Sequence, residues 1–108
     1  MVVIRLKRMG SKGEPYYRIV AADRRKAPTG RFLDSFGFYD PLKKPMEIKV
    51  DEKRVFYWLD KGAQVSDTVK SILKRTGTWS KWSRISVGEK EIEPEVVFLK
   101  GENRTSRG

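Results

Sequence analysis

The chain has 108 residues and contains no cysteine or histidine, and its 24 Lys and Arg against 14 Asp and Glu give a formal net charge of +10. The two absences exclude the commonest transition-metal ligands, cysteine nucleophiles and Ser-His-Asp triads. The length suits one domain. Because a strongly cationic surface repels itself, the surplus of positive charge favours an anionic partner.

Neither a membrane-spanning segment nor an export signal is expected. The longest uninterrupted apolar run is Val55 to Leu59, far shorter than the roughly 20 residues that span a bilayer. Arg5, Lys7 and Arg8 fall where a signal peptide needs its apolar stretch, so the start of the chain does not favour export.

The first 31 residues, which hold nine basic and two acidic side chains, begin with a predicted β-hairpin. In residues 2–7, apolar side chains alternate with Arg5 and Lys7, which predicts a strand with one apolar and one basic face. The segment Gly10-Ser11-Lys12-Gly13 predicts a turn, and residues 16–21 alternate again. The second strand should therefore pair antiparallel with the first and place Arg18 beside it.

A basic loop and two more strands should follow the hairpin. Asp23 to Gly30, which contains the run Arg24-Arg25-Lys26, has Pro and Gly but no hydrophobic period and predicts a loop. Phe32 to Tyr39 is expected to form a third, aromatic-rich strand, and Glu47 to Val50 a short fourth one.

Two helices are predicted after these strands. Asp51 is a suitable N-cap for a helix of about three turns that ends at Gly62, and Ser66 caps a second helix that ends at Gly77. Strands followed by helices favour an α+β fold. We expect a small antiparallel or mixed sheet of three to five strands with two helices packed on it, plus a C-terminal extension.

The extension is expected to differ in role from the preceding domain. We assign residues 1–84 to the domain and 85–108 to the extension, in which Glu89, Glu91, Glu93 and Glu95 form an acidic row that disfavours contact with phosphate. The apolar run Val96 to Leu99 should pack on the domain, as an added strand or near Trp79 and Trp82, and Gly101 to Gly108 should fray. We interpret the two tryptophans as core residues, with base stacking as the alternative.

The basic face of the hairpin is the main candidate binding site. Alternate side chains of a strand lie about 6.6 Å apart, comparable to the spacing of phosphates along a nucleic-acid strand, so Arg5 and Lys7 could follow one. Arg18 widens the row, and Tyr16 offers a ring for stacking on an unpaired base. Gly10-Ser11-Lys12-Gly13 is either a structural turn or a phosphate contact through its amides and Lys12. A solvated outer face is the alternative for all of these residues.

A metal-dependent nuclease is the competing enzymatic hypothesis, since carboxylates are the remaining candidate ligands, namely Asp23, Asp34, Asp40, Asp51 and Glu52. The acidic candidates have structural roles that compete with metal binding, because Asp51 and Glu52 suit a helix start and Asp40 precedes a proline in a turn. A general duplex-DNA-binding protein is the second alternative. We expect no enzyme activity, catalytic residue, metal, cofactor or small-molecule substrate.

Several stretches of residues 1–77 resemble one family in order and spacing. They are Ile4-Arg5-Leu6-Lys7-Arg8-Met9-Gly10, Tyr17-Arg18-Ile19-Val20-Ala21-Ala22-Asp23, Gly30-Arg31-Phe32, Gly37-Phe38-Tyr39-Asp40-Pro41 and the run from Tyr57-Trp58-Leu59 to Thr68-Val69. Together they resemble bacterial small-subunit ribosomal protein sixteen, a component of the 30S subunit.

The resemblance implies a structural, cytoplasmic protein of the small ribosomal subunit that binds the 5′ domain of 16S ribosomal RNA, supports assembly and has neighbouring small-subunit proteins as partners. The RNA-facing residues that it implies are Arg5, Lys7, Arg8, Lys12, Arg18, Arg24, Arg25 and Arg31. The residue patterns add Tyr16 and Lys26 to this set.

Overall fold

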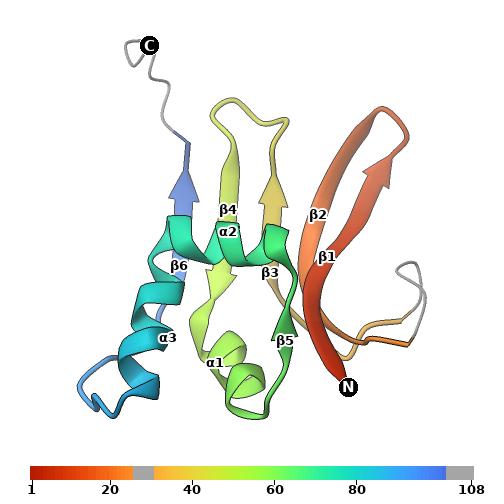
Figure 1. The fold of residues 1–108 in the computed structure, drawn as a ribbon. Helices are drawn as coiled ribbons and strands as arrows, with labels where there is room; N and C mark the ends of the chain where they lie inside the picture. The colour runs from red at the N-terminus through yellow and green to blue at the C-terminus, as the bar shows by residue number, and fades with distance from the viewer. Residues whose placement is uncertain (26–30, 102–108) are drawn as a thin grey trace.

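The computed structural model describes residues 1–25 and 31–101 as a curled six-stranded sheet with three helices on one face (Figure 1). The elements in chain order are β1 (Val2–Ser11), β2 (Glu14–Asp23), β3 (Asp34–Asp40), β4 (Glu47–Asp51), α1 (Glu52–Asp60), β5 (Gln64–Val65), α2 (Asp67–Thr76), α3 (Thr78–Ser86) and β6 (Val96–Lys100). The predicted α+β class is confirmed. The predicted counts were too low, because β5 and α3 were not expected and β6 completes a sixth strand.

The N-terminal hairpin forms as predicted. Residues of β1 and β2 pair antiparallel from Val2 with Asp23 to Ser11 with Glu14, so Lys12 and Gly13 make a two-residue turn. The strand order is β5-β1-β2-β3-β4-β6, with β5 parallel to β1 and the other neighbours antiparallel. The sheet is therefore mixed, one of the two arrangements expected.

A close approach between β3 and β4 depends on Gly37. This glycine has φ of +151° and pairs with Val50, and a Cβ built on it would overlap the carbonyl oxygen of Lys49. A register shift in the pairing of β2 with β3, between Ile19 and Val20, lies beside it. Such irregularities increase local twist and bend a strand, which is consistent with the curl of the sheet.

The helix ends follow the predicted signals in part. Ser66 caps α2 through its Oγ, which accepts a hydrogen bond from the Val69 N–H at 3.3 Å, and Gly77 ends the helix in the left-handed region with φ of +84°. Asp51 precedes α1 as predicted, but its side chain makes no capping hydrogen bond. The helix α3 begins at Thr78, directly after the glycine that predicted only an end.

The core lies between the sheet and the helices. Its buried members come from the strands and from α1 and α2, namely Ile4, Ile19, Ala21, Phe36, Ile48, Val50, Val55, Phe56, Val69, Ile72 and Leu73. Trp82 stacks on Phe56 with ring centroids 5.8 Å apart, and Trp79 packs against the core beneath the ammonium of Lys70. The core interpretation of the two tryptophans is confirmed.

The apolar run Val96 to Leu99 lies in the edge strand β6. Of its two predicted placements, the added strand is therefore the one that forms. It pairs antiparallel with β4. Hydrogen bonds fix both ends, because the Glu52 N–H donates to the Glu95 carbonyl at 3.0 Å and the Gly101 N–H to the Met46 carbonyl at 2.7 Å. The expected fraying concerns residues that lie, apart from Gly101, outside the described part. None of the described helices is long and apolar enough to cross a membrane.

Candidate nucleic-acid interface

A row of basic and aromatic side chains crosses five strands on the helix-free face of the sheet. The register pairs Lys7 with Arg18, Arg18 with Phe38, Phe38 with Lys49, and Lys49 with Phe98. Directly paired residues of neighbouring strands present their side chains on the same face. Three cations and two rings therefore lie along one line perpendicular to the strands, which we call the cross-strand row.

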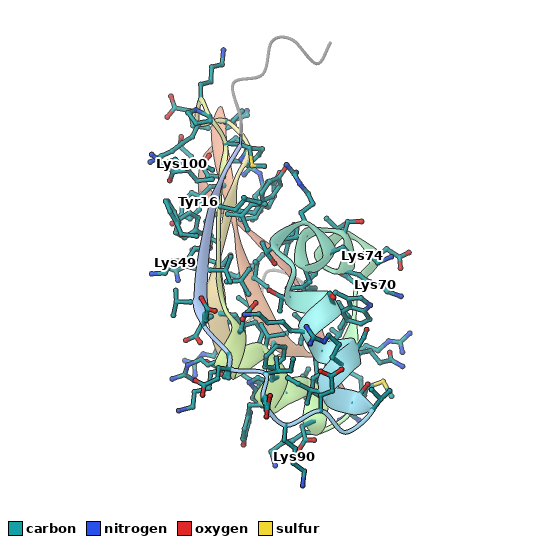
Figure 2. All side chains as sticks on the ribbon, turned by 90° about the vertical axis from the view of Figure 1, so that its left-hand side faces the viewer. Tyr16, Lys49, Lys70, Lys74, Lys90 and Lys100 are labelled. Carbon is teal, nitrogen blue, oxygen red and sulfur yellow. The ribbon has the colours of Figure 1, made fainter. Side chains whose placement is uncertain are left out.

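The helices leave this face accessible. Figure 2 shows Lys49 projecting from the side of the sheet opposite the helices, while Lys70 and Lys74 project on the helix side. A shallow hollow of about 390 Å³ lies on the helix-free face. Its lining includes Tyr16, Arg18, Phe38 and Lys49. The predicted stacking residue Tyr16 thus lies beside the middle of the cross-strand row.

Arg5, Lys7 and Arg18 are half-buried, whereas the alternative of a solvated outer face would require them to be fully solvated. The Arg18 guanidinium donates to the Ser35 Oγ at 3.4 Å, and Arg5 and Lys7 also have intramolecular contacts. On the same face of β2, Val20 and Ala22 are buried as well. The pattern of one apolar and one basic face was predicted for residues 2–7, and the outer side of β2 does not share it, because it combines Arg18 with these buried apolar residues.

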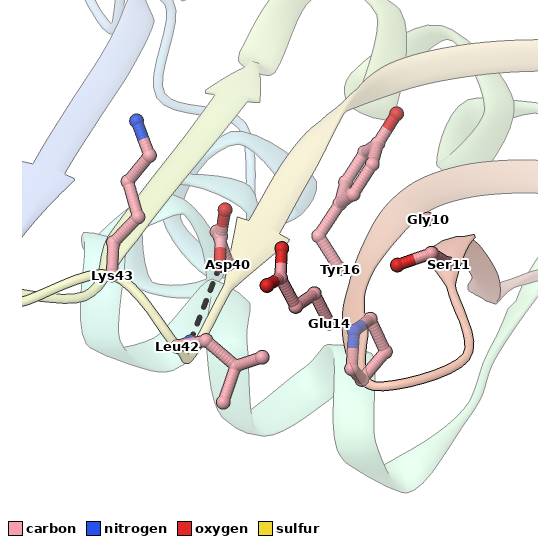
Figure 3. Close-up of a pocket in the computed structure, with 8 residues that line it drawn as sticks. Gly10, Ser11, Glu14, Tyr16, Asp40, Leu42 and Lys43 are labelled. Carbon is pink, nitrogen blue, oxygen red and sulfur yellow. Dashed lines mark hydrogen bonds between the residues drawn. The ribbon is translucent and has the colours of Figure 1, made fainter.

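The hairpin tip carries two more predicted residues, and both are exposed. An Arg8 guanidinium N–H donates to the Lys12 carbonyl at 3.2 Å. A hollow beside the tip has Glu14 and Asp40 in its lining, and the Leu42 N–H donates to an Asp40 carboxylate oxygen at 3.2 Å (Figure 3). Lys43 also lines this hollow, but the two carboxylates outnumber its ammonium, which favours the structural interpretation of the turn over a phosphate cradle.

The remaining predicted residues lie at the opposite end of the hairpin. The Arg24 guanidinium donates to the Gln64 Oε1 at 3.2 Å, and Arg31 is exposed. The Arg25 backbone N–H donates to Asp23, and this bond with the nearby guanidinium lowers the pKa of the Asp23 carboxyl. Lys26 lies outside the described residues. A ten-residue strand is about 30 Å long, so the structure brings Arg5, Lys7, Arg18 and Tyr16 together but not the whole predicted set.

The carboxylates considered for a nuclease take part in structural contacts. Asp34 accepts hydrogen bonds from Arg54 at 2.9 and 3.0 Å and from the Trp58 Nε1 at 2.9 Å. Burial alone would raise the pKa of Asp34, but the bonds from Trp58 and Arg54 lower it. Among residues 1–25 and 31–101, no three acidic side chains are grouped as they would be to hold a metal ion. No observation in the described part therefore favours the nuclease.

The buried carboxylate of Glu52 joins α1 to α3 and to the residue before β6. It accepts hydrogen bonds from the Thr78 Oγ1 and the Lys81 Nζ, both at 2.7 Å, and from the Glu95 N–H at 3.0 Å. The hydrogen bond to Glu52 is the main reason that the pKa of Lys81 is raised. Lys81, which the sequence left without a clear role, is thus a structural residue.

Three members of the cross-strand row were missed from the sequence, namely Phe38, Lys49 and Phe98. Each lies in a segment expected to be extended, but Phe98 belongs to the uninterrupted apolar run Val96 to Leu99, which does not show which side chains face outward. Which strands lie beside the hairpin, and in which register, depends on pairings between distant segments. Only the sheet order places these three side chains in line with Lys7 and Arg18.

The fold and this face define a small, basic α+β protein with a two-layer core and an accessible sheet surface that combines cations with aromatic rings. The chain belongs to the ribosomal protein S16 family, whose model matches residues 8–66. This confirms the resemblance seen in the sequence. Members of this family are structural components of the cytoplasmic ribosome and not enzymes.

Three relatives show the extent of the similarity, each named small ribosomal subunit protein bS16. The Moorella thermoacetica protein is 52% identical over 79 residues, which are 73% of this chain and 88% of the relative. The Desulforamulus reducens protein is 55% identical over 76 residues, 70% and 85% of the two chains. The Dictyoglomus turgidum protein is 54% identical over 82 residues, 76% and 88% respectively. The helix α3 and the strand β6 follow the segment that the family model matches.

Proposed function

We propose that this protein is a structural constituent of the small ribosomal subunit that binds 16S ribosomal RNA in its 5′ domain and supports subunit assembly, in contact with neighbouring small-subunit proteins. Residues 1–84 act as the RNA-binding domain in this proposal. The names of the relatives support the ribosomal role, and the charge of +10 supports an anionic partner.

The observation that carries the RNA-binding proposal is the position of Arg5, Lys7 and Arg18 on the helix-free face. Arg5 and Lys7 are two residues apart on β1, and Lys7 pairs directly with Arg18 on β2. Arginine can bind phosphate oxygens in a bidentate manner, and fixed cations at strand spacing suit a polyanion. Tyr16 adds a ring beside them, which suits RNA because specific RNA recognition uses unpaired, stacked bases.

The test is equilibrium binding to a 16S 5′-domain RNA and to duplex DNA of equal length across a salt series. If about six to eight phosphates are neutralised, log K should fall against log salt with a slope of about −4 to −7. The protein should bind the RNA more tightly than the DNA at each salt concentration. Equal affinity for both polymers would instead favour the general DNA-binding alternative, because non-specific phosphate contacts treat them alike.

A charge-matched pair of variants tests the surface. Changing Arg5, Lys7 and Arg18 together to Gln should lower RNA affinity at least tenfold and make the salt slope shallower by about two to three units. The control changes Lys74, Arg75 and Lys90, which are exposed, to Gln and should shift affinity much less. Circular dichroism checks that both variants fold. If the two variants lose affinity equally, the hairpin face is not the binding surface.

A further inference from the structure

The exposed ring of Phe98 is out of place for a residue that only stabilises the sheet. Phe98 is 52% exposed on the edge strand β6, and its ring meets that of Phe38 edge-to-face with centroids 6.4 Å apart. Val96, two residues earlier on the same face, is 58% exposed. Phe98 and Val96 therefore form an exposed apolar patch on the outer face of the edge strand, next to the ring of Phe38.

The ring is also held firmly in place. Neighbouring strands lie about 4.8 Å apart, and β4 lies between the strands of Phe38 and Phe98, so the two rings lean towards each other across Lys49. The hydrogen bonds of Glu52 with Glu95, and of Gly101 with Met46, anchor β6 at both ends. A ligand would therefore meet a preformed surface and would not have to order a free segment.

The charges around the ring fit a nucleic acid. No described carboxylate pairs with the Lys49 ammonium, and the cross-strand row continues to Arg18 and Lys7. The nearest acidic residues on the same face of β4 already have cationic neighbours, since Glu47 lies 3.4 Å from Lys43 and Asp51 lies 4.0 Å from Arg54. An apolar protein partner would leave the ammonium of Lys49 desolvated without a counter-charge. A single-stranded RNA segment supplies both phosphates and bases.

We propose that Phe98, supported by Phe38 and flanked by Lys49, is a stacking site for an unpaired base of the ribosomal RNA. The C-terminal strand β6 thus extends the RNA-binding face beyond the segment that the family model matches, which ends at residue 66. The acidic row of residues 89–95 does not oppose this, because it precedes β6. The inference rests on the proposed function and adds to it a site on the extension.

The test uses the full chain and the same 5′-domain RNA. Changing Phe98 to Ala or Leu should lower affinity about 5- to 150-fold, the range for loss of one base–aromatic stack. Changing Phe98 to Tyr should keep near-parental affinity, because the ring remains. None of these changes should alter the salt slope, whereas Lys49→Gln should make it shallower by about one unit. Val96→Ala is the control on the same strand and face, and it should change affinity by less than twofold.

Each outcome is decisive. If Phe98→Ala binds as tightly as the parent, Phe98 does not contact the RNA and the inference fails while the proposed function stands. If Leu matches the parent, the site is an apolar contact and not a stack. If circular dichroism shows that Phe98→Ala alters folding, the affinities of Phe98→Leu and Phe98→Tyr are compared instead, and equal affinities would overturn the stacking site. Failure of the parent protein to bind the RNA would overturn the proposed function itself, and the inference with it.

Discussion

Replacing Lys81 by Met should destabilise the protein through the buried carboxylate of Glu52. Glu52 is fully buried, and Lys81, with a side chain 26% exposed, is its cationic partner at 2.7 Å. Removing one partner of a buried ion pair costs about 3–5 kcal/mol, because the remaining charge stays buried without compensation. Thr78 and the Glu95 N–H still donate to Glu52 in the variant, and Lys81 is partly exposed. We therefore expect a loss of about 2–4 kcal/mol in the free energy of unfolding.

Urea unfolding followed by circular dichroism measures this loss, and calorimetry should show Tm lower by about 10–20 °C. The matched control is Arg84→Met, which removes a cation one turn along α3. Arg84 pairs with Glu89 at 3.0 Å, but both side chains are about half exposed, so the control should cost less than about 1 kcal/mol. Equal losses in the two variants would refute the structural role given to Glu52.

The ion pair of Glu52 with Lys81 should also make stability depend on pH. Glu52 raises the pKa of Lys81 above its ordinary value of 10.5. The contribution of this ion pair to the free energy of unfolding is therefore fully present below pH 10.5 and is lost as the pH rises through the folded-state pKa of Lys81. The stability difference between the parent and Lys81→Met should therefore be constant from pH 7 to 9 and shrink at higher pH. A difference that grows with pH would contradict this assignment.

Two further variants test local structure. Gly37→Ala should cost roughly 2–4 kcal/mol, since its Cβ would overlap the Lys49 carbonyl, whereas Gly13→Ala, with open space around it, should be near neutral; equal urea midpoints would refute the close approach. Asp34→Asn should lose about 1–2 kcal/mol at pH 7. Because the pKa of Asp34 is lowered from 3.8, this difference should diminish as the pH falls below 3.8 towards the folded-state pKa, and a difference that grows as the pH falls would contradict it.

The parts of the fold that the sequence predicted are those with local signals. The cap at Ser66 and the helix end at Gly77 each depend on residues within a few positions, and the structure has both. The turn predicted at Gly10-Ser11-Lys12-Gly13 is also present, but only its last two residues form it, because Gly10 and Ser11 continue β1. The helix α3 was missed because its start has no capping side chain and because Thr and Trp are weak helix formers. The strand β5 has two residues, too few for a pattern.

The candidate site was predictable only where it is local to the hairpin. Arg5, Lys7 and Arg18 follow from alternation within β1 and β2 and from the turn between them. Their half-burial did not follow, because it involves contacts outside the hairpin, such as that of the Arg18 guanidinium with the Ser35 Oγ. The position of Lys49 relative to Arg18 depends on how β2 pairs with β3 and β3 with β4. The pairing of β2 with β3 contains a register shift between Ile19 and Val20, and no local sequence pattern predicts such a shift.

The extension changes what β4 does in this chain. Without β6, β4 would be an edge strand with unpaired backbone groups, which is a site for unwanted strand pairing. Pairing with β6 satisfies those groups and moves the edge outward by one strand. The extension is also tied to the core, because Glu52 at the start of α1 accepts hydrogen bonds both from α3 and from the residue before β6. Loss of the Lys81 contact should therefore weaken the anchoring of β6 as well as the core, and RNA binding through Phe98 should fall with it at temperatures where the hairpin remains folded.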